Sequence, residues 1–555
     1  MNILFIMYDQ LRFDYLSCAG HAALETPNFD RVAARGVRFD RAYVQSPICG
    51  PSRMSFYTGR YASSHGAQWN GFPLRVGEVT LGDHLREAGM DCWLLGKTHM
   101  KADARGMARL GLSADSVIGA RQAECGFDAW ARDDGLWGMG PDGFYDEKRS
   151  PYNAYLTSKG YDGDNPWADY ANAGVADGEI ASGWMFRNAD KPANIREEDS
   201  ETPWLTSEAI RFVDEATGPW CAHVSFIKPH WPYIVPAPYH DMYGKDDIQA
   251  PVRDPSERAD PHPVLAAYHD IRVAQAFQQD EVRETVIPAY MGLIKQCDDQ
   301  LGRLLDHLEA TGKMDDTMIV LTSDHGDYLG DHWLGEKDFF HEASVRIPMI
   351  ICDPRASADA TRGTTCDALV EAIDLAATFV EAAGGTVADH ILEGRSLMPW
   401  IRGETPADWR EYVISEYDYS VTPRAEALGV SPRDARMFMV FDGRWKLIHF
   451  EGGFRPMLFD LKTDPDEFTD LGARDEHAAQ IDRMYGFLGQ WGRRMSQRVT
   501  KSDAEIKAMR GGSMRRGILP FLVDGSEVPE ALTELYRGPV RQVHLDAAPA
   551  GEDQQ

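Results

Sequence analysis

Short runs of apolar residues recur at wide spacing along the chain, and segments with the periodicity of amphipathic helices lie between them. The runs cover residues 3–8, 91–95, 219–227, 317–322 and 347–352. The clearest helical pattern covers 287–310, where the apolar positions are Met291, Ile294, Cys297, Leu301, Leu304, Leu305 and Leu308. Continuous apolar strands that alternate with such helices are typical of a parallel sheet covered on both faces. The sequence therefore predicts an α/β fold with a large, mostly parallel sheet flanked by helices.

The length of the chain indicates more than one domain, since single hydrophobic cores stop growing well below 555 residues. We predict a large α/β domain over residues 1–410. Within it, 101–200 is rich in Gly, Asp, Trp and Tyr and shows little periodicity, which indicates a loop-rich insertion. This insertion is either a lid over a pocket or a solvated excursion.

The pattern changes to short strands in the last quarter of the chain. Residues 437–441 and 445–450 flank Asp442-Gly443, a strong hairpin signal. A smaller α+β domain with a short antiparallel sheet and a C-terminal tail is therefore predicted over 411–555.

The chain carries a strong excess of negative charge, with a formal net charge of −30. Such a charge repels polyanions, so neither nucleic acid nor a membrane surface is an expected partner.

No stretch has the length of a membrane span, and the N-terminal apolar run lacks the basic flank of a signal peptide. The eight cysteines show no CxxC spacing, so most are expected to be reduced core thiols in a cytoplasmic protein. Because the net charge of the chain is −30, an anionic substrate would need a local cluster of positive groups at its binding site.

Acidic residues follow two of the predicted strands at the point where each strand ends. Asp9 and Gln10 come directly after the first apolar run, and Asp324 and His325 come just past the fourth. Because ligands gather at the carboxyl ends of parallel strands, both pairs are expected at one edge of the sheet. Oxygen ligands with one imidazole suit a divalent cation, with Mn²⁺ expected and Zn²⁺, Ca²⁺ and Mg²⁺ as alternatives. Taken singly, the aspartates could instead end strands and cap helices.

The most specific signal is the segment Cys49-Gly50-Pro51-Ser52-Arg53, which is followed by Thr58-Gly59-Arg60. It closely resembles the Cys-x-Pro-x-Arg motif of the type I sulfatases of the alkaline phosphatase superfamily, in which that cysteine is converted to formylglycine. The resemblance implies an alkaline-phosphatase-like fold, a formylglycine at position 49 and a maturation enzyme that generates it.

The resemblance covers most of the chain, from about residue 2 to about residue 471. The matching segments before residue 300 are Gly96-Lys97-Thr98-His99 and Lys228-Pro229-His230-Trp231-Pro232. Those after it are Ser323-Asp324-His325-Gly326, Gly330-Asp331-His332 and Lys337, then Leu458-Phe459-Asp460-Leu461 with Asp464-Pro465-Asp466-Glu467.

The family's mechanism implies a role for each of these residue types. An aldehyde at position 49 hydrates to a diol, and a hydroxyl of that diol attacks sulfur or phosphorus. Arg53 would hold the diol, and the side chains implied around the transferring group are Lys97, His99, His230 and Lys337. Either His230 or Lys337 would protonate the leaving oxygen, and His99 would act as the base that releases the product. The implied ligands of one divalent metal ion are Asp9, Gln10, Cys49, Asp324 and His325.

The chain departs from many sulfatases at the metal pairs. Asp9-Gln10 and Asp324-His325 resemble the metal pairs of the phosphonate monoester hydrolase and choline-sulfatase branch. Asn70, five residues after His65, also matches the phosphonate branch in its spacing and is expected to touch the transferred group. Those phosphonate hydrolases do not keep the Lys-x-His pair, whereas Lys97 and His99 are present here. The mixture indicates an arylsulfatase-like enzyme with promiscuous activity on phosphonates or phosphodiesters.

Several functions stay open at this stage. Hydrolysis of small sulfate esters leads, and hydrolysis of phosphonate monoesters or phosphodiesters at the same site is the alternative. A silent protein that holds an anion and a metal is disfavoured by the intact maturation segment, and a phosphomutase would need a Ser or Thr nucleophile. The tail segment 515–522 could contact a second subunit, so a homo-oligomer is expected.

Overall fold

The computed structural model describes residues 1–113, 116–135 and 150–510. The chain forms one compact unit over Met1–Gln497 and a second over Arg498–Gln555. The second unit contains α17 (Asp503–Met509). The tail segment 515–522, predicted to contact a second subunit, lies outside the described residues, as does the part of the predicted insertion over 136–149.

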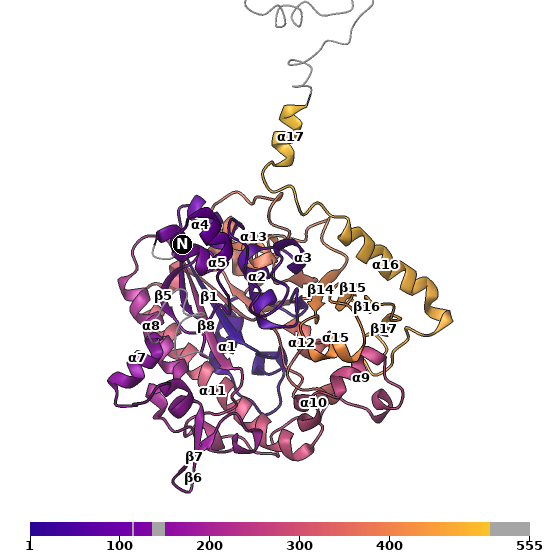
Figure 1. The fold of residues 1–555 in the computed structure, drawn as a ribbon. Helices are drawn as coiled ribbons and strands as arrows, with labels where there is room; N and C mark the ends of the chain where they lie inside the picture. Colours follow the sequence, from indigo (N-terminus) through magenta and orange to yellow (C-terminus); the bar gives the residue numbers. More distant parts are fainter. Residues whose placement is uncertain (114–115, 136–149, 511–555) are drawn as a thin grey trace, which may run out of the picture. The chain divides into compact units, whose positions relative to one another are not determined.

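An eight-stranded mixed sheet lies at the centre of the first unit (Figure 1). Its order is β12 (Thr364–Cys366), β2 (Val37–Phe39), β11 (Met349–Cys352), β9 (Thr317–Ser323), β1 (Asn2–Asp9), β8 (Trp220–Pro229), β4 (Asp91–Gly96) and β5 (Asp128–Arg132). β11 runs antiparallel to both of its neighbours, and the other neighbouring pairs are parallel. The predicted α/β fold with a mostly parallel sheet is confirmed.

Helices of the first unit flank its sheets and connect their strands. They are α1 (Pro27–Arg35), α2 (Cys49–Thr58), α3 (Ala62–His65), α4 (Leu81–Glu87), α5 (Ala104–Leu110), α6 (Val117–Ala123), α7 (Pro151–Ser158), α8 (Glu201–Glu215), α9 (Pro263–His269), α10 (Arg272–Phe277), α11 (Asp280–Ala310), α12 (Glu342–Val345), α13 (Asp374–Ala382), α14 (Met398–Ile401), α15 (Pro423–Ala427) and α16 (Ala478–Gly492). Within the described residues, no helix is both long enough and apolar enough to cross a membrane.

Strand β1 separates two hydrophobic cores because alternate side chains of a strand point to opposite faces. On one face its residues Leu4, Ile6 and Tyr8 pack into a core that includes α8 and α11. On the other face Ile3, Phe5 and Met7 pack into a core that includes α2, α4 and α13. A strand buried on both faces explains why the run reads as continuously apolar in sequence.

Strands β1 and β9 end side by side. Tyr8 is in register with Ser323, so Asp9 and Asp324 leave the sheet at adjacent positions. β8 flanks β1 on its other side, with Pro229 opposite Asp9. The carboxyl edge of the sheet therefore collects the residues that the sequence predicts there.

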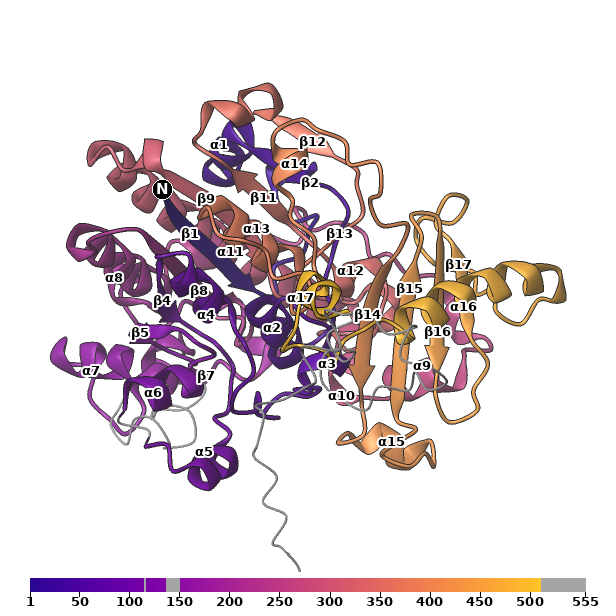
Figure 2. The same cartoon turned by 90° about the horizontal axis from the view of Figure 1, so that it is seen from above.

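A four-stranded antiparallel sheet forms the C-terminal part of the first unit. Its order is β14 (Val413–Asp418), β15 (Arg436–Phe441), β16 (Trp445–Phe450) and β17 (Met457–Asp460), with α16 beside it (Figure 2). The hairpin at Asp442-Gly443 joins β15 to β16 as expected, because Gly443 adopts a φ of 90° that glycine tolerates best. The predicted antiparallel sheet is confirmed, while the domain boundary at residue 410 stays a prediction.

Two predicted elements differ in their bounds. The apolar run 347–352 is divided at Pro348 into β10 (Arg346–Ile347) and β11, because proline has no N–H to donate to a ladder. β10 joins a separate sheet with β3 (Ala42–Tyr43) and β13 (Val370–Glu371). Helix α11 begins at Asp280 rather than at 287, since its first two turns carry mostly charged residues that hydrophobic periodicity does not detect.

The segment 101–200 contributes ordered elements as well as loops. β5 extends the central sheet beside β4, and β6 (Ala173–Ala176) pairs with β7 (Glu179–Ser182) in a separate hairpin. All eight cysteines are free, and six of them are buried.

A buried ion pair joins the C-terminal sheet to the segment after β9. Lys446 of β16 is 0% exposed, and its Nζ lies 2.8 Å from Glu342 and 2.6 Å from Glu467. Its Nζ also donates to the carbonyl oxygen of Phe340 at 3.0 Å.

Replacing Lys446 by Ala removes the cation that the buried Glu467 shares with Glu342 and should lower the free energy of unfolding by about 3–5 kcal/mol. Urea denaturation followed by circular dichroism measures the change. The exposed Lys462→Ala serves as the control and should shift the free energy by less than about 0.5 kcal/mol. Equal stability of the two variants would contradict the assigned role of the ion pair.

Candidate active site

Cys49 is the first residue of α2. The N-terminal end of a helix carries partial positive charge and favours anions. Gly50 is needed here because a Cβ at this position would lie 2.8 Å from Asn70 Oδ1. That oxygen accepts a hydrogen bond from the Gly50 N–H at 2.7 Å. The structure thus places Asn70, predicted to touch the transferred group, beside the start of α2.

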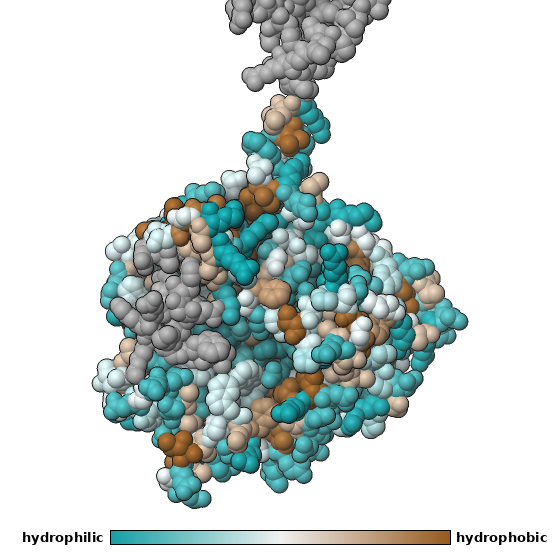
Figure 3. Space-filling view, viewed as in Figure 1, coloured by the Kyte–Doolittle hydropathy of each residue, from teal (hydrophilic) through white to brown (hydrophobic). Residues whose placement is uncertain are grey.

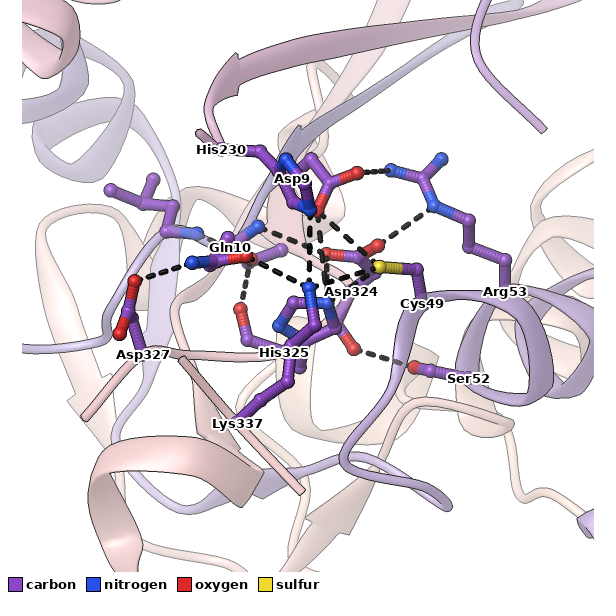
Figure 4. Close-up of polar contacts among 12 residues, drawn as sticks. Asp9, Gln10, Cys49, Ser52, Arg53, His230, Asp324, His325, Asp327 and Lys337 are labelled. Carbon is purple, nitrogen blue, oxygen red and sulfur yellow. Dashed lines mark hydrogen bonds and ion pairs between the residues drawn. The ribbon is translucent and has the colours of Figure 1, made fainter. Parts of the chain in front are cut away.

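Four potential metal ligands meet at the carboxyl edge of the sheet (Figure 4). Among the described residues, Asp9, Cys49, Asp324 and His325 are fully buried and offer ligand atoms that all lie within 4.8 Å of one another. His325 Nε2 lies 3.0 Å from Cys49 Sγ, 3.7 Å from Asp9 Oδ1 and 3.6 Å from Asp324 Oδ1. Cys49 Sγ lies 3.8 Å from Asp9 Oδ1. Cys49 is present as the unmodified thiol, so its sulfur stands where an oxygen of hydrated formylglycine would lie.

This geometry fits one divalent cation. With metal–ligand distances of about 2.0–2.2 Å, neighbouring ligand atoms around one ion stand about 3.0–3.6 Å apart. The four separations given above lie at or slightly above this range, and no pair of ligand atoms exceeds 4.8 Å, so modest inward shifts would bring them to one ion. Two carboxylates and an imidazole are a donor set for a borderline or hard divalent ion.

Arg53 holds the two carboxylates together. It lies four residues after Cys49 and therefore on the same face of α2. Its Nε donates to Asp324 Oδ2 at 2.7 Å, its Nη2 to Asp9 Oδ2 at 3.2 Å and its Nη1 to Ser225 Oγ at 2.7 Å. All three charged side chains are 0% exposed. The guanidinium, predicted to hold the diol, is occupied here by the metal-site carboxylates.

The side chain of Gln10 lies among Lys337, Tyr233 and Asp327. Its backbone has a φ of 65°, and its N–H donates to Asp324 Oδ1 at 3.1 Å. Its side-chain Oε1 accepts a hydrogen bond from Lys337 Nζ at 2.9 Å. Its Nε2 donates to Asp327 and to the hydroxyl of Tyr233. In this structure Gln10 therefore orients Lys337, and its role as a metal ligand stays a prediction.

Lys337 joins the nucleophile position to His230. Its Nζ lies 3.4 Å from Cys49 Sγ and 3.1 Å from His230 Nε2. His230 Nδ1 lies 2.7 Å from the carbonyl oxygen of Trp231, which can only accept, so the ring proton is on Nδ1 and Nε2 accepts from Lys337. Burial, helped by the adjacent Lys337, lowers the pKa of His230 to about 3, which agrees with a neutral ring.

Lys97 approaches the site from the end of β4. Its ammonium pairs with Asp9 Oδ2, and its carbonyl oxygen accepts from Arg53. Burial raises the pKa of the Cys49 thiol, but Lys337 and the other cations outweigh burial, so this pKa lies well below its ordinary value. The site therefore stabilises negative charge at the position of Cys49, although the whole chain is strongly acidic.

His99 lies two residues beyond Lys97, in a turn fixed by Asp134. Asp134 Oδ1 accepts from the N–H groups of Thr98 and His99 at 3.0 and 3.2 Å. The buried Nδ1 of His99 has no hydrogen-bond partner in the part of the chain that the structure describes. The role of His99 as a base stays a prediction.

Around Cys49, the structure brings eight predicted site residues into contact with one another. They are Asp9, Gln10, Arg53, Lys97, His230, Asp324, His325 and Lys337.

Four residues that support the site are absent from the sequence-based prediction: Asp134, Ser225, Tyr233 and Asp327. Asp327 follows His325 by two residues, so its proximity was a signal that could have been used. Ser225 and Tyr233 carry no such signal, because serine and tyrosine residues in or after a buried strand usually have only a packing role. Only the tertiary fold brings them to Arg53 and Asp327.

Comparison with known proteins matches this site to one family. A family model described as Sulfatase matches residues 1–385, which include every predicted site residue. The chain belongs to the sulfatase family. A second model, the C-terminal region of N-sulphoglucosamine sulphohydrolase, matches residues 330–490. The family implies a divalent metal and a formylglycine derived from cysteine, and Cys49 occupies the precursor position.

Several relatives within the family resemble the chain over nearly their whole length. The multifunctional alkaline phosphatase superfamily protein PehA of Trinickia caryophylli is 31% identical over 86% of this chain and 93% of its own. An arylsulfatase of Clostridium perfringens is 28% identical over 88% of this chain and 93% of its own. The phosphonate monoester hydrolase SpPMH of Silicibacter pomeroyi superposes with a TM-score of 0.77 at 31% identity, covering 90% and 96% of the two chains. These neighbours confirm the alkaline-phosphatase-like fold.

Replacing His325 by Ala removes the imidazole from the ligand cluster and should weaken metal binding by at least about tenfold. Titration calorimetry of the metal-stripped protein with Mn²⁺ measures the affinity, and plasma mass spectrometry measures the metal content after purification. His99→Ala is the matched control and should keep the affinity of the parent. Parent-like metal binding by His325→Ala would contradict the assigned cluster.

Proposed function

We propose that this sulfatase-family chain hydrolyses small sulfate esters with a formylglycine formed from Cys49. The observation that carries this proposal is the position of Cys49 Sγ, 3.4 Å from Lys337 Nζ at the N-terminal end of α2. A nucleophile at this point faces a metal-ligand cluster on one side and an ammonium donor on the other.

The proposed reaction uses residue 49 twice. One hydroxyl of the hydrated aldehyde attacks sulfur and expels the alcohol, which leaves a sulfate ester on the diol carbon. Loss of the proton from the second hydroxyl then re-forms the aldehyde and releases sulfate, and water hydrates the aldehyde again. A divalent metal bound by Asp9, Asp324 and His325 would supply Lewis-acid activation of the nucleophile. Arg53 keeps those carboxylates in place, and Lys97 adds positive charge beside Asp9.

Lys337 is the proposed proton donor to the leaving oxygen. His230 holds its ring proton on Nδ1, towards the Trp231 carbonyl, so the proton shared between Lys337 and His230 Nε2 belongs to the ammonium. His230 therefore acts by positioning Lys337. The buried Nδ1 of His99, which has no hydrogen-bond partner among the described residues, supports the proposed role of His99 as the base in the second step.

Hydrolysis of phosphonate monoesters or phosphodiesters is the second candidate. Sulfate monoesters, phosphonate monoesters and phosphodiesters each carry one negative charge on the transferring group, so one pocket can receive all three. The resemblance to PehA, which is called multifunctional, and to phosphonate monoester hydrolases of Silicibacter pomeroyi and Agrobacterium radiobacter favours this second activity. The expected enzyme is promiscuous across these ester classes.

Further features belong to the same proposal. Mn²⁺ is the proposed metal because two carboxylates and one imidazole form a mixed oxygen and nitrogen set, with Ca²⁺ or Zn²⁺ as alternatives. A formylglycine-generating enzyme is the proposed maturation partner. We also propose that the protein works in the cytoplasm as a homo-oligomer.

The proposed function is tested by kcat/KM for matched 4-nitrophenyl esters of sulfate, phenylphosphonate and a phosphate diester. The parent should turn over the sulfate ester, with the other two as secondary substrates, and Cys49→Ala should lose at least about 10³-fold on all three because nucleophile and metal contact vanish together. The buried Cys125→Ala is the matched control and should keep its activity. Negligible sulfatase activity beside fast phosphonate turnover would reverse the order of the two candidates.

A further inference from the structure

A row of aromatic rings extends from His230 towards the surface of the molecule. The His230 ring lies 4.4 Å from the Trp231 ring, centroid to centroid. Trp231 lies 5.5 Å from Trp184, and Trp184 lies 6.2 Å from the buried Trp167. We call Trp231 and Trp184 the aromatic wall.

Trp184 is exposed although it belongs to a tightly held segment. Its exposed fraction is 48%, whereas that of Trp167 is 2%. The preceding Gly183 packs against backbone so closely that a Cβ there would lie 2.0 Å from the carbonyl oxygen of Asn172. An exposed indole on a fixed backbone presents apolar surface at little backbone cost, which is typical of a binding surface.

The wall is also tied to the loop that carries His230. Lys228 Nζ donates to Asn172 Oδ1 at 2.7 Å and to the Pro232 carbonyl oxygen at 2.9 Å. Asn172 directly precedes β6, so Lys228 links the β6–β7 hairpin to the loop of Trp231. These hydrogen bonds therefore hold the start of the hairpin against the loop that carries His230 and Trp231.

The direction of the leaving group follows from the proposed chemistry. Displacement at sulfur or phosphorus places the leaving oxygen opposite the attacking atom, and its proton comes from Lys337, which lies against His230. Such a placement directs a substituent on that oxygen along the Lys337–His230 contact, and the ring that packs next to His230 is Trp231. We infer that Trp231 and Trp184 form a subsite for an aryl leaving group. This inference rests on the proposed function.

The geometry of the wall favours a flat aromatic ring. The planes of Trp231 and Trp184 meet at 62°, so a ring that stacks on one indole presents its face to the edge of the other. Aromatic rings prefer such offset and edge-to-face contacts. A quaternary ammonium group is the competing occupant of the two indoles, and the ammonium of Lys337, 3.1 Å from His230 Nε2, disfavours it by repulsion.

The subsite is tested with the full-length, metal-loaded enzyme and three variants, Trp184→Ala, Trp184→Phe and Ile180→Ala. Trp184→Ala should raise KM for 4-nitrophenyl sulfate on the order of 10-fold with little change in kcat, since a stacking contact binds ground state and transition state alike. The inhibition constant of methyl sulfate, which has no ring, should change by less than about twofold. Trp184→Phe should restore most of the affinity for the aryl ester.

Ile180→Ala controls for local disturbance. Ile180 lies in β7 of the same β6–β7 hairpin and is 66% exposed. Figure 3 shows hydrophobic surface at the lower left, over this hairpin. This variant should match the parent with both compounds. Equal losses with the aryl and the ring-free compound, no loss with either, or a larger loss with choline sulfate than with the aryl ester would each overturn the subsite.

A binding measurement separates failure of the subsite from failure of the proposed function. In a Cys49→Ala background, which does not turn over, 4-nitrophenyl sulfate should quench tryptophan fluorescence. Adding Trp184→Ala should raise the concentration needed for half-maximal quenching on the order of 10-fold, whereas Trp184→Phe should leave it near that of the background. Quenching that depends on Trp184 in a chain without esterase activity would support the subsite and contradict only the proposed function. Quenching that is independent of Trp184 would overturn the subsite.

Discussion

The buried contact between Arg53 and two carboxylates is the interaction on which the site depends. Parallel pairing of β1 with β9 brings Asp9 and Asp324 out of the sheet at adjacent positions, and two like charges in a buried place repel strongly. The guanidinium of Arg53 bridges them from α2, while the ion that they are arranged to hold would offset the remaining charge. Because Arg53 and Cys49 share one helical face, the same contact fixes the nucleophile beside the metal ligands.

This arrangement resolves the conflict between an acidic chain and an anionic substrate. The net charge of −30 is spread over the whole molecule, whereas Arg53, Lys97 and Lys337 converge within one buried cluster. Together with a divalent ion they outnumber the two ligand carboxylates. Interactions in a buried site are weakly screened, so this local excess determines what the site binds.

Much of the fold could be predicted from the sequence because its strands are buried on both faces and read as continuous apolar runs. The site residues could be predicted where a motif carries them, as with Cys49 and Arg53, or where a polar residue ends a strand, as with Asp9 and Asp324. Contacts that only the tertiary fold creates could not be predicted. Tyr233 and Asp327 illustrate this, since both accept hydrogen bonds from the Gln10 side chain that no motif in the sequence indicates.

The division of roles between His230 and Lys337 likewise required the structure. Sequence left open which of the two donates the proton, because both lie in matching segments. The carbonyl of Trp231 decides the tautomer of His230, and that contact depends on how the backbone turns after β8. The same turn places the aromatic wall, whose two indoles come from segments that lie almost fifty positions apart in the sequence and share no motif.

The chemical state of residue 49 tests the account most directly. Trypsin should release the peptide Ala42–Arg53, and mass spectrometry of this peptide from active protein should show an aldehyde in place of the CH₂SH group. The peptide that contains Cys125 should keep its thiol in the same digest. Full hydrolytic activity from protein in which Cys49 is entirely an unmodified thiol would contradict the central claim.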